Sequence, residues 1–241
     1  MKKARRVLLK VSGEWFSGNK EKGFDEKTFE SLAKSLVEAK RKNIQIALVL
    51  GGGNIYRGRE LTSLKIDQVS ADYIGMLSTI MNGIALSNFL SSNECENNLY
   101  SSFAIGNFVK AYSKEEAEKT LIENKIVILV GGLGNPLFTT DSTASVRAVE
   151  LNSDIMLKAT TVDGIYSDDP KINKKAIKYD FLTFDEAITK NLKVMDQTSL
   201  CFCRDNNLNV RVFNADSQGA ILEAISNENT KIGTLVRLKN D

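Results

Sequence analysis

Two glycine-containing segments near the N-terminus follow short apolar runs, and both could bind an anion. The earlier is Lys10-Val11-Ser12-Gly13-Glu14, whose serine and glycine permit a tight turn that frees backbone N–H groups beside a compact lysine charge. The later is Gly51-Gly52-Gly53-Asn54, with Arg57 four residues beyond its last glycine. Glycine lets a phosphate approach the main chain, and arginine can hold phosphate oxygens with two parallel hydrogen bonds. The alternative for both segments is a strand-end turn without function.

Two later segments have a similar composition. Residues 131–141 read Gly-Gly-Leu-Gly-Asn-Pro-Leu-Phe-Thr-Thr-Asp. A second anion could therefore lie at the N-terminus of the helix that is expected to begin at Asp141. Alternatively, Thr140 or Asp141 only caps that helix. Residues 158–170 begin with Lys158 at the end of an expected strand and contain Tyr166, whose ring could stack on a nucleobase. The alternative there is a polar turn.

Absent residue types and motifs narrow the chemistry. The chain contains no histidine, which excludes Ser-His-Asp and Cys-His catalysis and histidine metal sites. It has no GxxxxGKS or GxxxxGKT motif, so it is not a P-loop enzyme. Leu137 stands where a GxGxxG motif would need its third glycine, which argues against a dinucleotide-binding dehydrogenase. The residues alone indicate a protein that binds two phosphate-bearing groups.

Charge and composition exclude further classes. Across 241 residues, Lys and Arg total 32 against 30 Asp and Glu, a net charge of +2, so we expect no nucleic-acid partner. The apolar run behind the basic N-terminus is too short for a signal peptide. Residues 73–93 are uncharged but carry serines, asparagines and glycines, which predicts a buried or interface helix and not a membrane span. The three cysteines are expected to be reduced thiols in a cytoplasmic protein.

Strand and helix patterns alternate along the chain. We expect strands at 6–11, 44–50, 103–108, 126–130, 154–159, 210–213 and, as a last edge strand, 233–238, with a short hairpin at 177–184. We expect helices at 25–42, 73–93, 114–123, 141–151, 185–190, 197–206 and 218–226. This order predicts an α/β fold, a mostly parallel central sheet with helices on both faces, in one domain spanning residues 1–241. In such a sheet, ligands bind at the carboxyl ends of the strands, where the four segments fall.

Six motifs in order resemble the bacterial UMP kinases (uridylate kinases) of the amino acid kinase family. They are Leu-Leu-Lys-Val-Ser-Gly-Glu, Gly-Gly-Gly-Asn-Ile-Tyr-Arg-Gly, Met-Leu-Ser-Thr-Ile-Met-Asn-Gly, Gly-Asn-Pro-Leu-Phe-Thr-Thr-Asp, Val-Asp-Gly-Ile-Tyr and, at 193–196, Lys-Val-Met-Asp. The pattern covers nearly the whole chain. The resemblance implies a three-layer sandwich and transfer of the γ-phosphoryl group of ATP to UMP, giving UDP and ADP, in pyrimidine nucleotide biosynthesis. It also implies Mg²⁺ carried on ATP with no metal site of the protein, and a homohexamer with the helix around 75–88 at the dimer contact.

The resemblance also implies site residues, position by position. ATP would meet Lys10, Val11, Ser12, Gly13, Gly53, Arg57, Thr160, Tyr166 and Asp169. UMP would meet Gly52, Asp72, Leu133, Gly134, Asn135, Pro136, Leu137, Phe138, Thr139 and Thr140. The residues expected to carry catalysis are Lys10, Asp141, Lys158 and Asp196, the two carboxylates holding the lysines in place. No general base is needed, because the acceptor is already a phosphate anion.

Three positions depart from the family pattern. Family members usually have threonine where this chain has Leu133, so a hydrogen bond to uracil is lost and the preference for UMP over CMP is less strict. Members activated by GTP carry arginines at Asn98 and Lys125, so weak or absent GTP activation is expected. Two alternatives stay open: a related carboxylate or carbamate kinase, and a non-catalytic nucleotide-binding storage or sensor protein.

Overall fold

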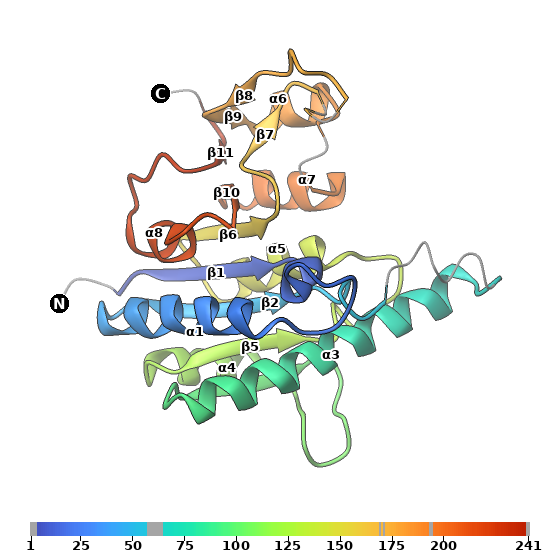
Figure 1. Ribbon diagram of the computed structural model, residues 1–241, viewed down its shortest axis with the longest axis vertical. Coiled ribbons are helices and arrows are strands. Elements are labelled where there is room, and N and C mark those ends of the chain that lie inside the picture. The colour runs from blue at the N-terminus through green and yellow to red at the C-terminus, as the bar shows by residue number, and fades with distance from the viewer. Residues whose placement is uncertain (1–3, 57–64, 169, 171, 193–194, 240–241) are drawn as a thin grey trace.

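The computed structural model describes residues 4–56, 65–168, 170, 172–192 and 195–239, and within them a nine-stranded sheet forms the centre of the molecule (Figure 1). The strand order is β4 (Lys110–Ala111), β3 (Asn97–Ser101), β5 (Ile126–Val130), β2 (Gln45–Leu50), β1 (Arg6–Val11), β6 (Ile155–Thr160), β10 (Val210–Asn214), β11 (Thr234–Arg237) and β9 (Phe181–Thr183). All neighbours run parallel except β10 and β11. The predicted mostly parallel α/β sheet is confirmed.

Helices cover both faces of the sheet, as predicted. One hydrophobic cluster joins the sheet to α1 (Glu26–Arg41), α3 (Gln68–Ser92) and α8 (Ala220–Ser226). A second joins the opposite face to α4 (Lys114–Ile122), α5 (Thr140–Glu150), α6 (Phe184–Thr189) and α7 (Gln197–Asp205). Along β1, Val7 and Leu9 belong to the first cluster and Leu8 to the second. A strand covered on both faces is apolar throughout, which explains why alternation is missing from its sequence.

The uncharged stretch forms most of α3, whose N-cap Asp67 accepts a hydrogen bond from the Ser70 backbone N–H at 3.0 Å. Length and composition alone would let this helix cross a bilayer, but 44% of its most apolar window is buried inside the protein. Ile80 and Leu86 face the core. The helix α3 is therefore a core element of the fold. Its opposite side carries apolar side chains that stay exposed, among them Leu77 and Met81.

Three expectations about strands are wrong. Residues 102–109 form a loop after β3, with a single bridge between Ile105 and Val109, because Gly106 turns the chain at φ 52°. No hairpin forms within 177–184: β8 (Lys178–Tyr179) pairs with β7 (Ile165–Tyr166), while β9 pairs with β11. The expected edge strand, β11, is an inner strand because β9 covers it.

Candidate active site

The two N-terminal glycine segments touch each other at the carboxyl ends of β1 and β2. A Cβ on Gly13, the first residue of the 3₁₀ helix η1 (Gly13–Ser17), would lie 2.3 Å from the backbone nitrogen of Gly53. On its other side the loop packs on α3, where a Cβ on Gly52 would lie 2.9 Å from the carbonyl oxygen of Gly75. Only glycine permits these backbone contacts. Two turns expected to bind anions are thus parts of one surface.

The central feature of the site is a buried carboxylate between two lysines. Lys10 on β1 and Lys158 on β6 are register partners, so their side chains project side by side. Asp141, in the first turn of α5, lies between them: Lys10 Nζ is 2.9 Å from Oδ1 and Lys158 Nζ is 2.6 Å from Oδ2. Lys10 is 7% exposed and Asp141 9%. The structure therefore brings together three of the four residues expected to carry catalysis.

The charges in this triad are unbalanced. Burial opposes ionisation of Asp141, but the charges of Lys10 and Lys158 outweigh it and lower the pKa of Asp141 to about 2. Burial lowers the pKa of Lys158, the charge of Lys10 acts in the same direction, and Asp141 offsets them only in part. One carboxylate shared by two ammonium groups leaves an excess positive charge facing the strand ends. That excess favours a phosphate.

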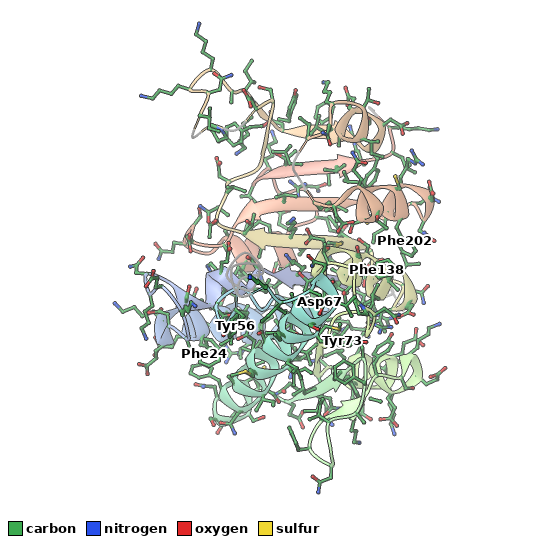
Figure 2. The ribbon with its side chains drawn as sticks, turned by 90° about the vertical axis from the view of Figure 1, so that its right-hand side faces the viewer. Phe24, Tyr56, Asp67, Tyr73, Phe138 and Phe202 are labelled. Atoms are coloured by element: carbon green, nitrogen blue, oxygen red, sulfur yellow. The ribbon has the colours of Figure 1, made fainter. Side chains whose placement is uncertain are left out.

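The loop 131–139 connects β5 to α5 and lies against α3. Gly131, Gly132 and Gly134 all have positive φ, which glycine adopts without strain. Asp72 of α3 accepts a hydrogen bond from the Leu137 backbone N–H at 2.7 Å. The same loop contains further residues that are expected to bind UMP: Leu133, Asn135, Pro136 and Phe138. Phe138 is 50% exposed, and Figure 2 shows it on the same side of the molecule as Tyr73 of α3.

The cap of α5 differs from the expectation. Thr139, and not Thr140 or Asp141, is the N-cap: its Oγ1 accepts hydrogen bonds from the backbone N–H groups of Asp141 and Ser142 at 3.0 and 3.2 Å. Thr140 is the first helical residue. The carboxylate of Asp141 is therefore free of a capping role and points at the lysines.

Asp196 is bound mainly to the first residues of α5 and α7. It is the N-cap of α7 and accepts hydrogen bonds from Thr139 Oγ1 at 2.5 Å, Ser199 Oγ at 2.6 Å and Ser142 Oγ at 3.2 Å. Burial opposes its ionisation, but these hydrogen bonds outweigh it and lower the pKa of Asp196. Its effect on Lys158 is a smaller electrostatic attraction. Asp196 thus anchors the start of α5 to α7, while Asp141 pairs with both lysines.

The residues expected to hold adenosine lie along β6 and β7. Thr160 ends β6, and its carbonyl oxygen accepts a hydrogen bond from Ala215 N at 2.8 Å. Tyr166 on β7 is hydrogen-bonded to Asp163 at 2.7 Å across the turn between them. Ser12, whose N–H donates to Ala159 O at 3.2 Å, and Val11 complete the β1 end. Arg57 and Asp169 lie outside the described residues.

Two structural features of the site were not anticipated. Asn82, fully buried on α3, donates a hydrogen bond to the Gly51 carbonyl oxygen at 2.6 Å, and Thr79 Oγ1 accepts one from Gly131 N at 2.8 Å. Both glycine loops are therefore fixed to α3. The sequence did contain a signal for these contacts: Thr79 and Asn82 are polar residues in an uncharged helix whose other residues are typical of a hydrophobic core. Among the described residues, no group of three or more acidic or cysteine side chains is placed to hold a metal ion.

The mostly parallel sheet brings two lysines and two touching glycine turns to one edge, and the sequence has no P-loop motif. This is the arrangement of a small-molecule kinase. The chain belongs to the amino acid kinase family, whose model matches residues 5–214. It is 42% identical over 231 residues to the uridylate kinase of Alcanivorax borkumensis, covering 96% of this chain and 91% of the relative. The predicted family is confirmed.

Solved structures agree with the sequence relatives. The UMP kinase from Bacillus anthracis superimposes with a TM-score of 0.93 at 36% identity, covering 98% of this chain and 97% of that one. The UMP kinase from Ureaplasma parvum gives a TM-score of 0.91 at 38% identity, with 98% and 99% covered. The resemblance to UMP kinases predicted from the six motifs is therefore confirmed over nearly the full chain.

Proposed function

We propose that this chain is a UMP kinase that transfers the γ-phosphoryl group of ATP to UMP, giving UDP and ADP. Uridylate kinases and UMP kinases are similar to it over nearly its whole length. The observation that carries the chemistry is Asp141 held between Lys10 and Lys158 at the ends of the two central strands. This arrangement fixes two cations where two phosphate groups can meet.

The main barrier is electrostatic. Two unit charges of like sign 4 Å apart repel by about 4 kcal/mol at an effective dielectric of 20. Both substrates carry more than one negative charge on their phosphate groups. Lys10, Lys158 and the backbone N–H groups of the glycine turns offset this repulsion and stabilise the equatorial charge of the transition state. Mg²⁺ arriving on ATP supplies further positive charge. Asp141 keeps the lysines in place and exchanges no proton, since its pKa of about 2 leaves it ionised.

Substrate positions follow from the resemblance, and the local geometry supports them. The ATP phosphates would lie against residues 10–13 and Gly53, with Arg57 where the substrates converge, and adenosine against Thr160, Tyr166 and Asp169. UMP would lie between Gly52, Asp72 and the loop 133–140. This loop and Asp72 are already joined, because the Leu137 N–H donates to the Asp72 carboxylate. The two nucleotides then meet end to end at the lysine pair.

We also propose that the chain acts in pyrimidine nucleotide biosynthesis in the cytoplasm, as a homohexamer. The support for assembly is the uncovered side of α3, where four apolar side chains are 40–51% exposed: Tyr73, Leu77, Met81 and Ile84. Their spacing places them on one helical face. Light scattering at low protein concentration tests the assembly. A Leu77→Glu variant should yield smaller particles, and an unchanged particle size would contradict the α3 contact.

The activity is tested by ADP release in a coupled assay with UMP, CMP, carbamate and glutamate as acceptors. The proposal expects the highest kcat/KM with UMP and measurable turnover with CMP, since Leu133 offers uracil no side-chain hydrogen bond. Turnover with carbamate or glutamate alone would indicate a carboxylate or carbamate kinase. Binding of both nucleotides without ADP release would indicate a storage or sensor protein. Either of these results overturns the proposal.

A further inference from the structure

Arg211 is a buried cation without a carboxylate partner among the described residues. It lies on β10 between Leu157 of β6 and Leu235 of β11 and is 5% exposed. Its Nη1 donates to the Ile232 carbonyl oxygen at 2.8 Å. Burial lowers the pKa of Arg211, and the nearby charge of Arg5 lowers it further. A buried guanidinium is expensive unless an anion compensates its charge.

Arg5, just before β1, shares this environment. Its Nη1 is buried and has no hydrogen-bond partner in the described part of the chain. Burial lowers the pKa of Arg5, and the carboxylates of Glu228 and Asp154 oppose that shift. Glu228 is 4.0 Å from Arg5 Nε with its side chain 74% exposed, a geometry that contributes little. Asp154 accepts a hydrogen bond from the Arg6 backbone N–H at 2.7 Å. Within the described part of the chain, Arg5 thus keeps an unused donor and Arg211 has no ion pair.

Both arginines line one cavity of about 390 Å³ at the amino ends of β1, β6 and β10. Asn209 and the carboxylates Asp154 and Glu228 also line it, so its wall is largely polar. Parallel strands place this edge opposite the lysine pair. The five residue steps from Arg5, just before β1, to Lys10 correspond to about 16 Å of extended chain. The cavity is therefore separate from the candidate active site.

We propose that this cavity binds a phosphate-sized oxyanion between Arg5 and Arg211. Guanidinium groups present donors in a planar fork that matches the oxygens of phosphate, and a dianion would compensate both buried charges. Nη1 of Arg5, which has no hydrogen-bond partner among residues 4–56, 65–168, 170, 172–192 and 195–239, supplies a donor for the anion. The site is independent of the proposed kinase activity, because none of its residues belongs to the nucleotide sites.

The test is titration of the full chain with inorganic phosphate by calorimetry, at constant ionic strength. The active site is first saturated with UMP and a non-hydrolysable ATP analogue, so that only a second site can respond. We expect saturable binding, weakened at least about tenfold in Arg5→Gln, since a hydrogen bond to a charged group contributes about 1.5–3 kcal/mol. Arg204→Gln, at a partly exposed arginine of α7, is the matched control and should bind phosphate as the wild type does. No saturable binding, or equal binding in Arg5→Gln, overturns the proposal.

Crystals of the wild type soaked in tungstate give an independent readout that does not depend on how the variant folds. The proposal expects anomalous density between the Arg5 and Arg211 guanidinium groups while nucleotides occupy the active site. Tungstate located only at the nucleotide sites, or only at the surface, would overturn it. Arg211 is left unchanged in these experiments because its burial makes any substitution a test of folding.

Discussion

Asn54 and Asn82 exchange two side-chain amide hydrogen bonds, at 3.0 and 2.7 Å, between the loop after β2 and α3. Both side chains are fully buried. Each amide makes a further hydrogen bond to a backbone carbonyl, Asn54 to Gly23 and Asn82 to Gly51. Buried polar groups satisfied in this way fix one arrangement of the chain. The position of the glycine loop 51–53 is therefore set by α3.

Asn82→Ala should destabilise the protein and weaken ATP binding. The substitution leaves the amide of Asn54 and the carbonyl of Gly51 without their partner, which costs about 1–3 kcal/mol per buried group. Chemical denaturation measures the loss of stability, and the KM for ATP should rise because the glycine loop is no longer fixed. Asn93→Ala, at the exposed C-cap of the same helix, is the control. A variant within about 0.5 kcal/mol of the wild type would contradict this role for Asn82.

The sequence could predict the elements whose signal is local. The apolar runs at 6–11 and 126–130 coincide with β1 and β5, and the run at 44–50 contains β2, because strands covered on both faces need apolar residues throughout. Lys10 and Lys158 could be predicted as site residues because each places a charge near the end of an expected strand. The six motifs identified the family. The extent of the single domain, the site roles and the hexamer stay predictions.

Contacts between distant residues could not be predicted. Asn54 and Asn82 are 28 positions apart, and Thr139 and Asp196 are 57 apart, so neither pair leaves a local pattern. The apolar residues at 103–108 read as a strand, although the polar residues 97–101 take the place beside β5 through their backbone. The strand β3 forms because its backbone pairs with β5, and its polar side chains do not follow a strand pattern that the sequence could reveal.

Lys10→Ala should lower kcat far more than it raises KM. Lys10 stabilises charge that develops only as the phosphoryl group transfers, so its loss removes transition-state stabilisation, on the order of a hundredfold in kcat. Steady-state kinetics with ATP and UMP varied separately gives both constants. Lys119→Ala, at an exposed lysine of α4, should behave as the wild type. A large rise in KM with unchanged kcat would make Lys10 a binding residue only.

Asp141 should contribute stability that is lost only in strong acid. Its folded pKa of about 2 lies below its ordinary value of 3.8, so the contribution is complete above about pH 4 and disappears as the pH falls toward 2. Asp141→Asn leaves two buried lysines uncompensated and should lose about 3–5 kcal/mol at pH 7. The difference between variant and wild type should narrow between pH 4 and 2.

Urea denaturation between pH 7 and pH 2 measures how much Asp141 contributes to the free energy of unfolding at each pH. Asp185→Asn removes a carboxylate whose ion pair with Arg204 is exposed, and it should follow the wild type at every pH. A constant difference between Asp141→Asn and the wild type down to pH 2 would show that the lysines do not lower the pKa of Asp141.

Gly13→Ala should abolish activity, whereas Gly75→Ala should not. A Cβ at Gly13 would lie 2.3 Å from Gly53 N, which forces the two phosphate-facing turns apart. A Cβ at Gly75, inside α3, meets nothing within 4 Å, and alanine there should stabilise the helix by about 0.5–1 kcal/mol. Thermal unfolding and the ADP-release assay distinguish the two variants. An active Gly13→Ala enzyme would mean that the contact between the turns is not required.

GTP should raise the rate less than about twofold at any concentration, because Asn98 and Lys125 stand where the resemblance implies arginines in GTP-activated members. Asn98 carries no charge, and its amide is bound to Thr120 Oγ1 at 2.9 Å. Lys125 is a point charge that pairs with Glu123 at 3.0 Å, and it cannot hold a phosphate with two parallel hydrogen bonds. UMP phosphorylation is measured with GTP varied at subsaturating ATP, alongside a GTP-activated relative as the positive control. A severalfold increase would show that the effector response needs neither arginine.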